Sequence, residues 1–176
     1  DYGSIGEEKL VSSSRGRAYG AELLVRWLIP EKLTLVGAAT LYRSEYRATE
    51  DSDYIPSAWD NRFILNLSGV YDLPKYWSIG MKVSAIGGSP YTPYDEEASS
   101  LKVVWDAAGR PVYDYLKYNQ GRLDPYYQID LRVDKNFYFR KWTLGLYIDL
   151  QNVTFSKIRQ PDAYLSTGEI VNPEAL

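Results

Sequence analysis

Hydrophobic and polar residues alternate along six segments of the chain. Within residues 59–71, for example, Phe63, Leu65 and Leu67 point to one side of an extended backbone, and Asn66 points to the other. A period of two is typical of a β-strand with unlike faces. No segment combines a helical period with capping residues, so the sequence predicts an all-β, antiparallel, up-and-down meander. The predicted strands span residues 16–28, 33–46, 59–71, 77–88, 124–137 and 141–152.

The connections between these segments alternate in length. Short ones cover residues 29–32, 72–76 and 138–141, and long ones cover residues 47–58, 88–122 and 153–176. Alternate connections of a meander lie at the same end of the sheet, so we expect tight turns at one end and long loops at the other. Within the second long loop, the sequence DAAGRPVY predicts a small hairpin that turns at Ala–Gly.

The apolar face of such a sheet can meet a protein core or lipid. A soluble sandwich or a lipocalin-like binding domain alternates in the same way. The predicted strands are nevertheless long, at about 12 to 14 residues against the usual five or six. A tilted membrane strand needs about 9 to 11 residues within the hydrocarbon. The length therefore favours lipid.

The positions of aromatic and charged residues point the same way. Aromatic side chains on the apolar face gather beside the short turns, as in the girdle of a membrane barrel. This predicted girdle contains Trp27, Tyr71, Trp77, Phe137, Phe139 and Trp142, and a second set, Tyr19, Trp59 and Tyr127, marks the other interface. The opposite face carries charges of both signs, which a polar lumen accepts. These predicted lumen-facing charges are Glu22, Arg26, Asp60, Arg62, Lys82, Asp130, Arg132, Asp134 and Asp149.

The composition excludes several kinds of chemistry. The 176 residues carry a net charge of −3 and include no cysteine and no histidine. Disulfides, thiol catalysis and histidine-based catalysis are therefore impossible. The acidic balance argues against a nucleic-acid partner. We expect no enzymatic activity, no cofactor and no metal site.

One long loop stands out as a candidate ligand site. Residues 88–122 are rich in aromatic side chains that can stack on a sugar, a siderophore or a peptide; the alternative is a loop that packs on itself or over a barrel mouth. The candidate residues are Tyr91, Tyr94, Trp105, Tyr113, Tyr115 and Tyr118. The acidic clusters at residues 50–53 and 95–97 match no calcium loop, and we expect them to be solvated.

Several stretches resemble the barrel of a TonB-dependent outer-membrane receptor. They are SSSRGRAYGAELLVRW, YIPSAWDNRFILNLSGVY, GSPYTPY and NQGRLDPYYQIDLRVDKNFYF, the last followed by LGLYIDLQNVT. The resemblance lies in their order and spacing over about 140 of the 176 residues. It implies a plugged barrel of about 22 strands in the bacterial outer membrane. It also implies active import of a scarce, bulky solute such as a siderophore, glycan or peptide.

Six strands are too few to close such a barrel, which needs about eight or more. We therefore expect residues 1–176 to be a partial transmembrane β-barrel domain, without plug or final strand. The implied partners are outer-membrane lipid, the rest of the barrel and its plug, the TonB complex through the parent protein, and a surface lipoprotein. A passive porin or another outer-membrane barrel is the main alternative, and a soluble binding domain is the second.

Overall fold

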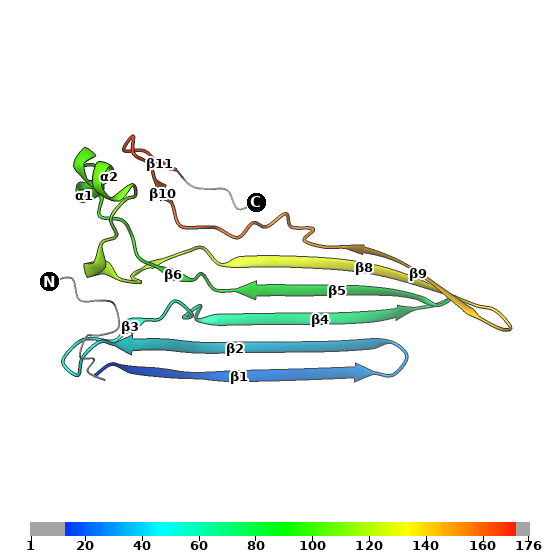
Figure 1. Cartoon of the computed structure of the whole chain (residues 1–176). Coiled ribbons are helices and arrows are strands. Elements are labelled where there is room, and N and C mark those ends of the chain that lie inside the picture. Colours follow the sequence, from blue (N-terminus) through cyan, green and yellow to red (C-terminus); the bar gives the residue numbers. More distant parts are fainter. Residues whose placement is uncertain (1–12, 172–176) are drawn as a thin grey trace.

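Six long strands lie side by side in one antiparallel sheet (Figure 1). The computed structural model describes residues 13–171 of the chain. The long strands are β1 (Arg15–Ile29), β2 (Leu33–Arg47), β4 (Phe63–Leu73), β5 (Trp77–Ile86), β8 (Tyr126–Tyr138) and β9 (Thr143–Leu150). They follow the order β1-β2-β4-β5-β8-β9, and a short strand, β3 (Ile55–Pro56), pairs with the end of β2. The predicted all-β antiparallel meander is confirmed. Over residues 13–171 the sheet is open, with β1 and β9 at its edges.

The strand boundaries agree with the prediction except at the third strand. We expected it to begin at Trp59, but β4 begins at Phe63. The backbone of Arg62 has a φ of 70°, in the left-handed region, which takes the chain out of the extended conformation. Asp60 and Arg62 therefore lie before the strand, and the prediction that they belong to it is wrong.

The strand register aligns like faces across the whole sheet. One row of partners runs Leu23, Ala39, Leu65, Ala85 and Tyr127 from β1 to β8. The adjacent row contains the next residue of β1, β4 and β8 and the preceding residue of β2 and β5: Leu24, Ala38, Asn66, Ser84 and Gln128. Because neighbouring residues point to opposite sides, the first row belongs to an apolar face and the second to a mostly polar face.

Within residues 13–171, no second layer covers the apolar face. Leu65, Leu131 and Leu146 are all exposed, and the only buried hydrophobic residues in the described part of the chain are Ala85 and Tyr164. The chain exposes 13822 Å², whereas a compact monomer of this mass exposes about 8,800 Å². The sheet therefore lacks the closed interior of a water-soluble sandwich.

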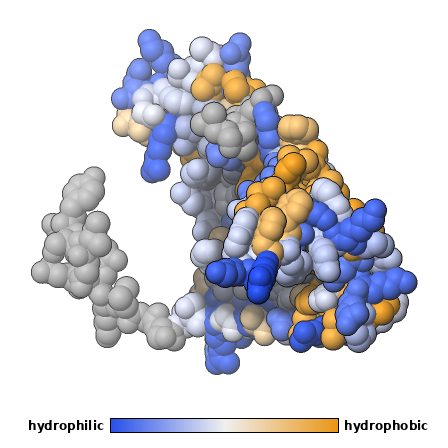
Figure 2. All heavy atoms as spheres, turned by 90° about the vertical axis from the view of Figure 1, so that its right-hand side faces the viewer, coloured by the Kyte–Doolittle hydropathy of each residue, from blue (hydrophilic) through white to orange (hydrophobic). Residues whose placement is uncertain are grey.

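The two ends of the sheet differ as the connection lengths predict. The short turns lie at one end, with the long loops and the small elements at the other (Figure 1). The turn between β1 and β2 is closed by a bond from Lys32 N to Ile29 O of 3.1 Å, with Glu31 at a φ of 57°. Seen from the short-turn end, hydrophobic and hydrophilic residues lie next to one another (Figure 2).

Short helices in the loop between β5 and β8 were not expected from the sequence. They are α1 (Glu96–Ser99), α2 (Lys102–Ala108) and the 3-10 turn η1 (Tyr115–Lys117). The predicted hairpin in DAAGRPVY is wrong, because Gly109 takes the left-handed conformation that ends α2. Two small ladders complete the fold: β6 (Pro90–Tyr91) with β7 (Gly121–Arg122), and β10 (Ala163–Tyr164) with β11 (Ile170–Val171). Among residues 13–171, no helix has the length and apolar character needed to cross a membrane.

Candidate ligand-binding groove

The loop between β5 and β8 folds back on itself at the long-loop end of the sheet. Its two arms are joined by the β6–β7 ladder and by an isolated bridge between Tyr94 and Tyr113. Backbone bonds of 2.9 Å from Asp95 N to Val112 O and from Asp114 N to Pro93 O hold the bridge on both sides. Tyrosines from opposite ends of the loop are thereby brought together.

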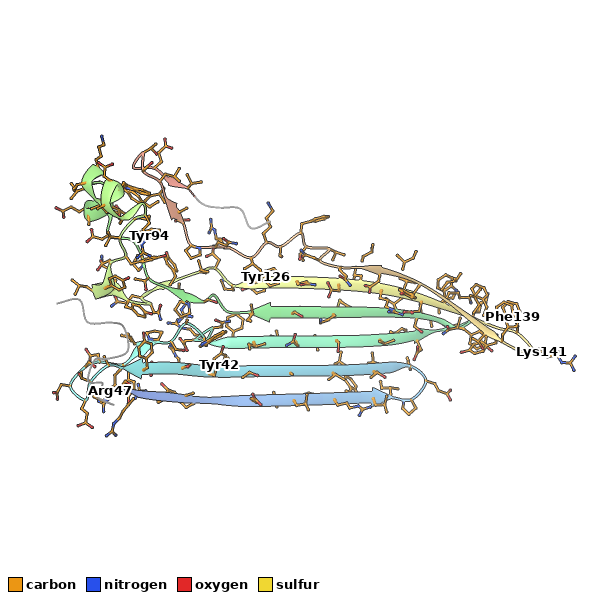
Figure 3. The ribbon with its side chains drawn as sticks, in the orientation of Figure 1. Tyr42, Arg47, Tyr94, Tyr126, Phe139 and Lys141 are labelled. Carbon is orange, nitrogen blue, oxygen red and sulfur yellow. The ribbon has the colours of Figure 1, made fainter. Side chains whose placement is uncertain are left out.

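Five tyrosines of this loop line one groove, which we call the tyrosine groove. Its volume is about 560 Å³, and its walls are Tyr91, Thr92, Tyr94, Tyr113, Tyr115, Tyr118 and Pro161. Tyr94 lies among the loops, far from the short turns (Figure 3). Five of the six predicted ligand-binding residues therefore converge on one place.

The tyrosine rings form a connected set of stacks. Tyr94 and Tyr113 stack with centroids 4.9 Å apart, and Tyr115 and Tyr118 lie nearly parallel at 6.4 Å. The rings of Tyr113 and Tyr115 lie edge to face with their centroids 6.3 Å apart, and this contact connects the two pairs. Burial, assisted by a hydrogen bond with Tyr113, raises the pKa of Tyr94 above its usual range.

Trp105 is not part of the groove. It lies on α2, and its indole Nε1 donates a 2.8 Å hydrogen bond to the carbonyl of Ser99. The fully buried Ser99 hydroxyl in turn donates to Val112 O at 3.2 Å and accepts from Val112 N at 3.1 Å. Trp105 thus fastens α2 to the loop. The structure places this predicted ligand-binding residue outside the groove, in a hydrogen bond with the backbone.

A segment after β9 also contributes to the groove. Pro161 lines it, and Tyr164 on β10 packs its ring edge to face with Tyr94 at 6.3 Å. Tyr164 is only 7% exposed, which makes it one of the best-buried side chains of the described chain. This contact could not be predicted from the sequence, because residues 88–122 and 153–176 are separate loops.

A buried carboxylate holds the loops beneath the groove. Asp60 is fully buried and accepts hydrogen bonds from Arg122 Nη2 at 2.8 Å and from Ser44 N at 3.0 Å. Arg43 lies 3.6 Å away. Arg122 Nη1 also donates to the carbonyls of Asp60 and Gly88, at 2.5 and 2.7 Å. We call this arrangement the Asp60–Arg122 latch; it connects the residues before β4, after β5 and on β7.

A second, smaller groove adjoins the first and shares Tyr91 with it. This polar groove has a volume of about 140 Å³ and is lined by Tyr91, Arg122, Leu123, Asp124, Arg159, Gln160 and Asp162. Arg159 forms an ion pair with Asp124. A Cβ on Gly121 would lie 2.7 Å from the Tyr91 ring, so the absence of a side chain there lets Tyr91 stand between the two grooves.

Most of the predicted lumen-facing charges lie on the polar face of the sheet. Lys82, Asp130, Arg132 and Asp149 line a hollow of about 380 Å³ on that face. Arg132 binds Asp134 of its own strand with two nitrogens, at 2.7 to 3.0 Å. Glu22 and Arg26 lie on β1, each two residues from Leu24, so they point to the same polar face of the sheet.

The predicted aromatic girdle is exposed at the short-turn end. Phe139 and Trp142 stack with centroids 4.0 Å apart, and Phe139 lies at the tip of the β8–β9 hairpin (Figure 3). Lys135 lies 5.2 Å above the rings of Trp77 and Phe137. Trp27 and Tyr71 are exposed as well, as are Tyr19, Trp59 and Tyr127 of the second set.

The acidic clusters have local structural roles. Asp95 caps α1 by accepting from Ala98 N at 2.9 Å, and Glu50 pairs with Arg15 at 2.6 Å. Within the described part of the chain, no three carboxylates come together in a way that could hold a metal ion.

Acid should loosen the wall of the tyrosine groove at Tyr115. Asp114 caps η1 by accepting from Leu116 N at 3.1 Å, and its hydrogen bond with Lys117 holds the pKa of this carboxyl below its usual range. Because the folded-state pKa lies below the ordinary carboxyl pKa of about 4, the ionised carboxylate stabilises the folded turn fully at pH values above about 4. This stabilisation is lost as the pH falls through the lower, folded-state pKa. The Leu116 amide shift in an NMR titration should report this change. An Asp114→Asn variant, which can still cap the turn, should show no such transition; the same transition in that variant would contradict the assignment.

No protein-family model, curated protein or solved structure matches the chain.

Proposed function

We propose that the chain is a membrane-embedded part of a TonB-dependent outer-membrane receptor that imports a bulky solute. The observation that carries the proposal is the uncovered apolar face, which the register continues across all six long strands. Burying one Leu, Ile or Val side chain away from water contributes about 1.5–3 kcal/mol. A face made of many such residues is therefore costly in water and favourable against acyl chains.

The edges of the sheet support a larger assembly. An unpaired strand edge in lipid leaves backbone N–H and C=O groups without partners, and each costs several kcal/mol. Both β1 and β9 present such an edge in residues 13–171. Further strands of the same barrel would satisfy them, and a plug and the TonB complex would act through that parent protein.

The two faces suit the two surroundings of a barrel wall. The charged side chains around Lys82 and Arg132 would face a polar lumen. The exposed rings of Trp27, Trp77 and Trp142 would lie at the interface beside the short turns, because amphipathic aromatics prefer the level of the lipid headgroups. The long loops with the tyrosine groove would then face the outside of the cell.

Spin labels can test this orientation, since the chain has no native cysteine. Leu65→Cys and Leu131→Cys place labels on the apolar face, and Asn66→Cys and Arg132→Cys are neighbours on the polar face. With the protein in lipid vesicles, labels on the apolar face should collide with oxygen, and labels on the polar face with a water-soluble nickel complex. If Leu65 and Leu131 labels met neither reagent, the apolar face would be packed inside protein and the proposal would fail.

Import requires a measurement of its own. In cells that take up a solute through the parent protein, collapse of the inner-membrane proton gradient should stop accumulation. Uptake that continues at an unchanged rate would indicate a passive pore instead.

A further inference from the structure

Among residues 13–171, no charged side chain lines the tyrosine groove. Its walls are five tyrosines, one threonine and one proline, so the only polar groups it offers are hydroxyls and backbone atoms. An anionic group placed there would lose water without gaining a counter-ion, which is unfavourable, whereas a tyrosine face can still attract a cation. The part of a ligand that enters this groove is therefore not anionic.

Three of the groove tyrosines are accessible to a ligand. Tyr115 is 67% exposed, and Tyr113 and Tyr118 are also exposed although they stack on other rings. Flat aromatic faces fit a ring-shaped ligand with apolar C–H or π faces, and phenol hydroxyls at the ring edges can bond polar groups on its rim. A pyranose ring has both properties, and a nucleobase has the first.

The adjoining polar groove distinguishes between these ligands. Its guanidinium, carboxylate and amide groups are planar, and each can form paired hydrogen bonds. Its two cations are already matched by acids, Arg122 by the buried Asp60 and Arg159 by Asp124. Planar groups whose cations are already paired suit neighbouring hydroxyls of a neutral ligand. An anionic ferric complex would require unmatched cations and would also be repelled by the remaining carboxylate, Asp162.

From these features we infer that the two grooves together bind a neutral oligosaccharide of at least two sugar rings. One ring stacks on the tyrosines, and the next reaches past Tyr91 so that Gln160 and Asp162 bond its hydroxyls. This inference rests on the proposed function in one respect only, that the grooves lie on the outer side of the barrel. It selects the glycan class among the solutes that such a receptor imports.

Calorimetry on the purified protein in detergent micelles can test the inference. The probes are neutral hexose and pentose oligomers of one to six units, a nucleoside, and an anionic ferric catecholate complex. We expect binding of the oligomers from two units upward. Tyr113→Ala should weaken it about tenfold, as the loss of one stacked aromatic does for other ring ligands, whereas Tyr113→Phe should retain it.

Two further variants separate local from general effects. Gln160→Ala should weaken the binding of longer oligomers and leave a monosaccharide unaffected. Tyr138→Ala is the matched control, because Tyr138 packs against Tyr76 at 4.8 Å at the opposite end of the sheet and should not change affinity. The inference is overturned if no neutral oligomer binds, if the nucleoside or ferric complex binds with the same dependence on Tyr113, or if Tyr113→Ala binds as the native protein does. These results do not depend on the spin-label experiment, which probes the strands alone.

Discussion

Replacing Asp60 with asparagine is expected to lower the free energy of unfolding by about 3 kcal/mol. The carboxylate is fully buried, and it lies between the guanidinium of Arg122 at 2.8 Å and that of Arg43 at 3.6 Å. Asparagine keeps the size of the side chain and can still accept from Ser44 N. Asparagine removes the negative charge, however, and leaves the positive charge of Arg122 largely buried without a counter-ion.

The estimate lies at the low end for broken buried ion pairs because the Arg122 side chain is 22% exposed. Urea unfolding of the protein in detergent, followed by tryptophan fluorescence, would measure the change. Glu50→Gln is the matched control: its pair with Arg15 is as short, at 2.6 Å, but both side chains are well exposed. Such a surface pair contributes about 0–1 kcal/mol. Equal losses in the two variants would show that burial of Asp60 has no special effect on stability.

The long strands could be predicted from the sequence because a period of two leaves little freedom in register. Slipping a strand by one residue would exchange the row of Leu23 and Leu65 for the row of Leu24 and Asn66. The same alternation misled us at residues 59–62, where Trp59 and Asn61 show the pattern before the chain has entered the strand. The positive φ of Arg62 interrupts the extended conformation directly before Phe63.

The helices escaped prediction because they are too short to show a period. α1 has four residues and α2 has seven, so neither completes the turns over which an apolar stripe becomes visible. Capping signals were nevertheless present. Asp95 is followed by two glutamates, and Gly109 stands where a helix commonly ends.

The candidate site could be predicted in composition and only partly in geometry. The density of tyrosines in residues 88–122 indicated a stacking surface, and five of the six candidates share the groove. The Asp60–Arg122 latch was missed because its partners are 62 residues apart and each belongs to a different loop. The role of Tyr164 was missed for the same reason, since contacts between loops have no period in the sequence.

An arginine introduced on the apolar face of β1 should lower the free energy of unfolding far more than an arginine introduced on the polar face of the same strand. Leu23 and Leu24 are adjacent near the middle of β1, each is paired with an alanine of β2, and they are 63% and 73% exposed. In water, these nearly equal exposures would make Leu23→Arg and Leu24→Arg almost equivalent. In a bilayer, Leu23→Arg should lower the free energy of unfolding by about 2–4 kcal/mol, the cost of arginine facing lipid near the midplane, while Leu24→Arg should cost little in a polar lumen.

The two variants can be compared by reversible urea unfolding in lipid vesicles, with tryptophan fluorescence as the signal. A difference of about 2 kcal/mol or more between them would support lipid contact, because backbone, strand and partner residue type are the same for both. Two small and equal effects would place β1 in water on both sides. Two large and equal effects would mean that protein packs against both faces of β1. Each of these results would contradict the proposed orientation, since only a wall between lipid and an aqueous lumen treats adjacent residues of similar exposure so differently.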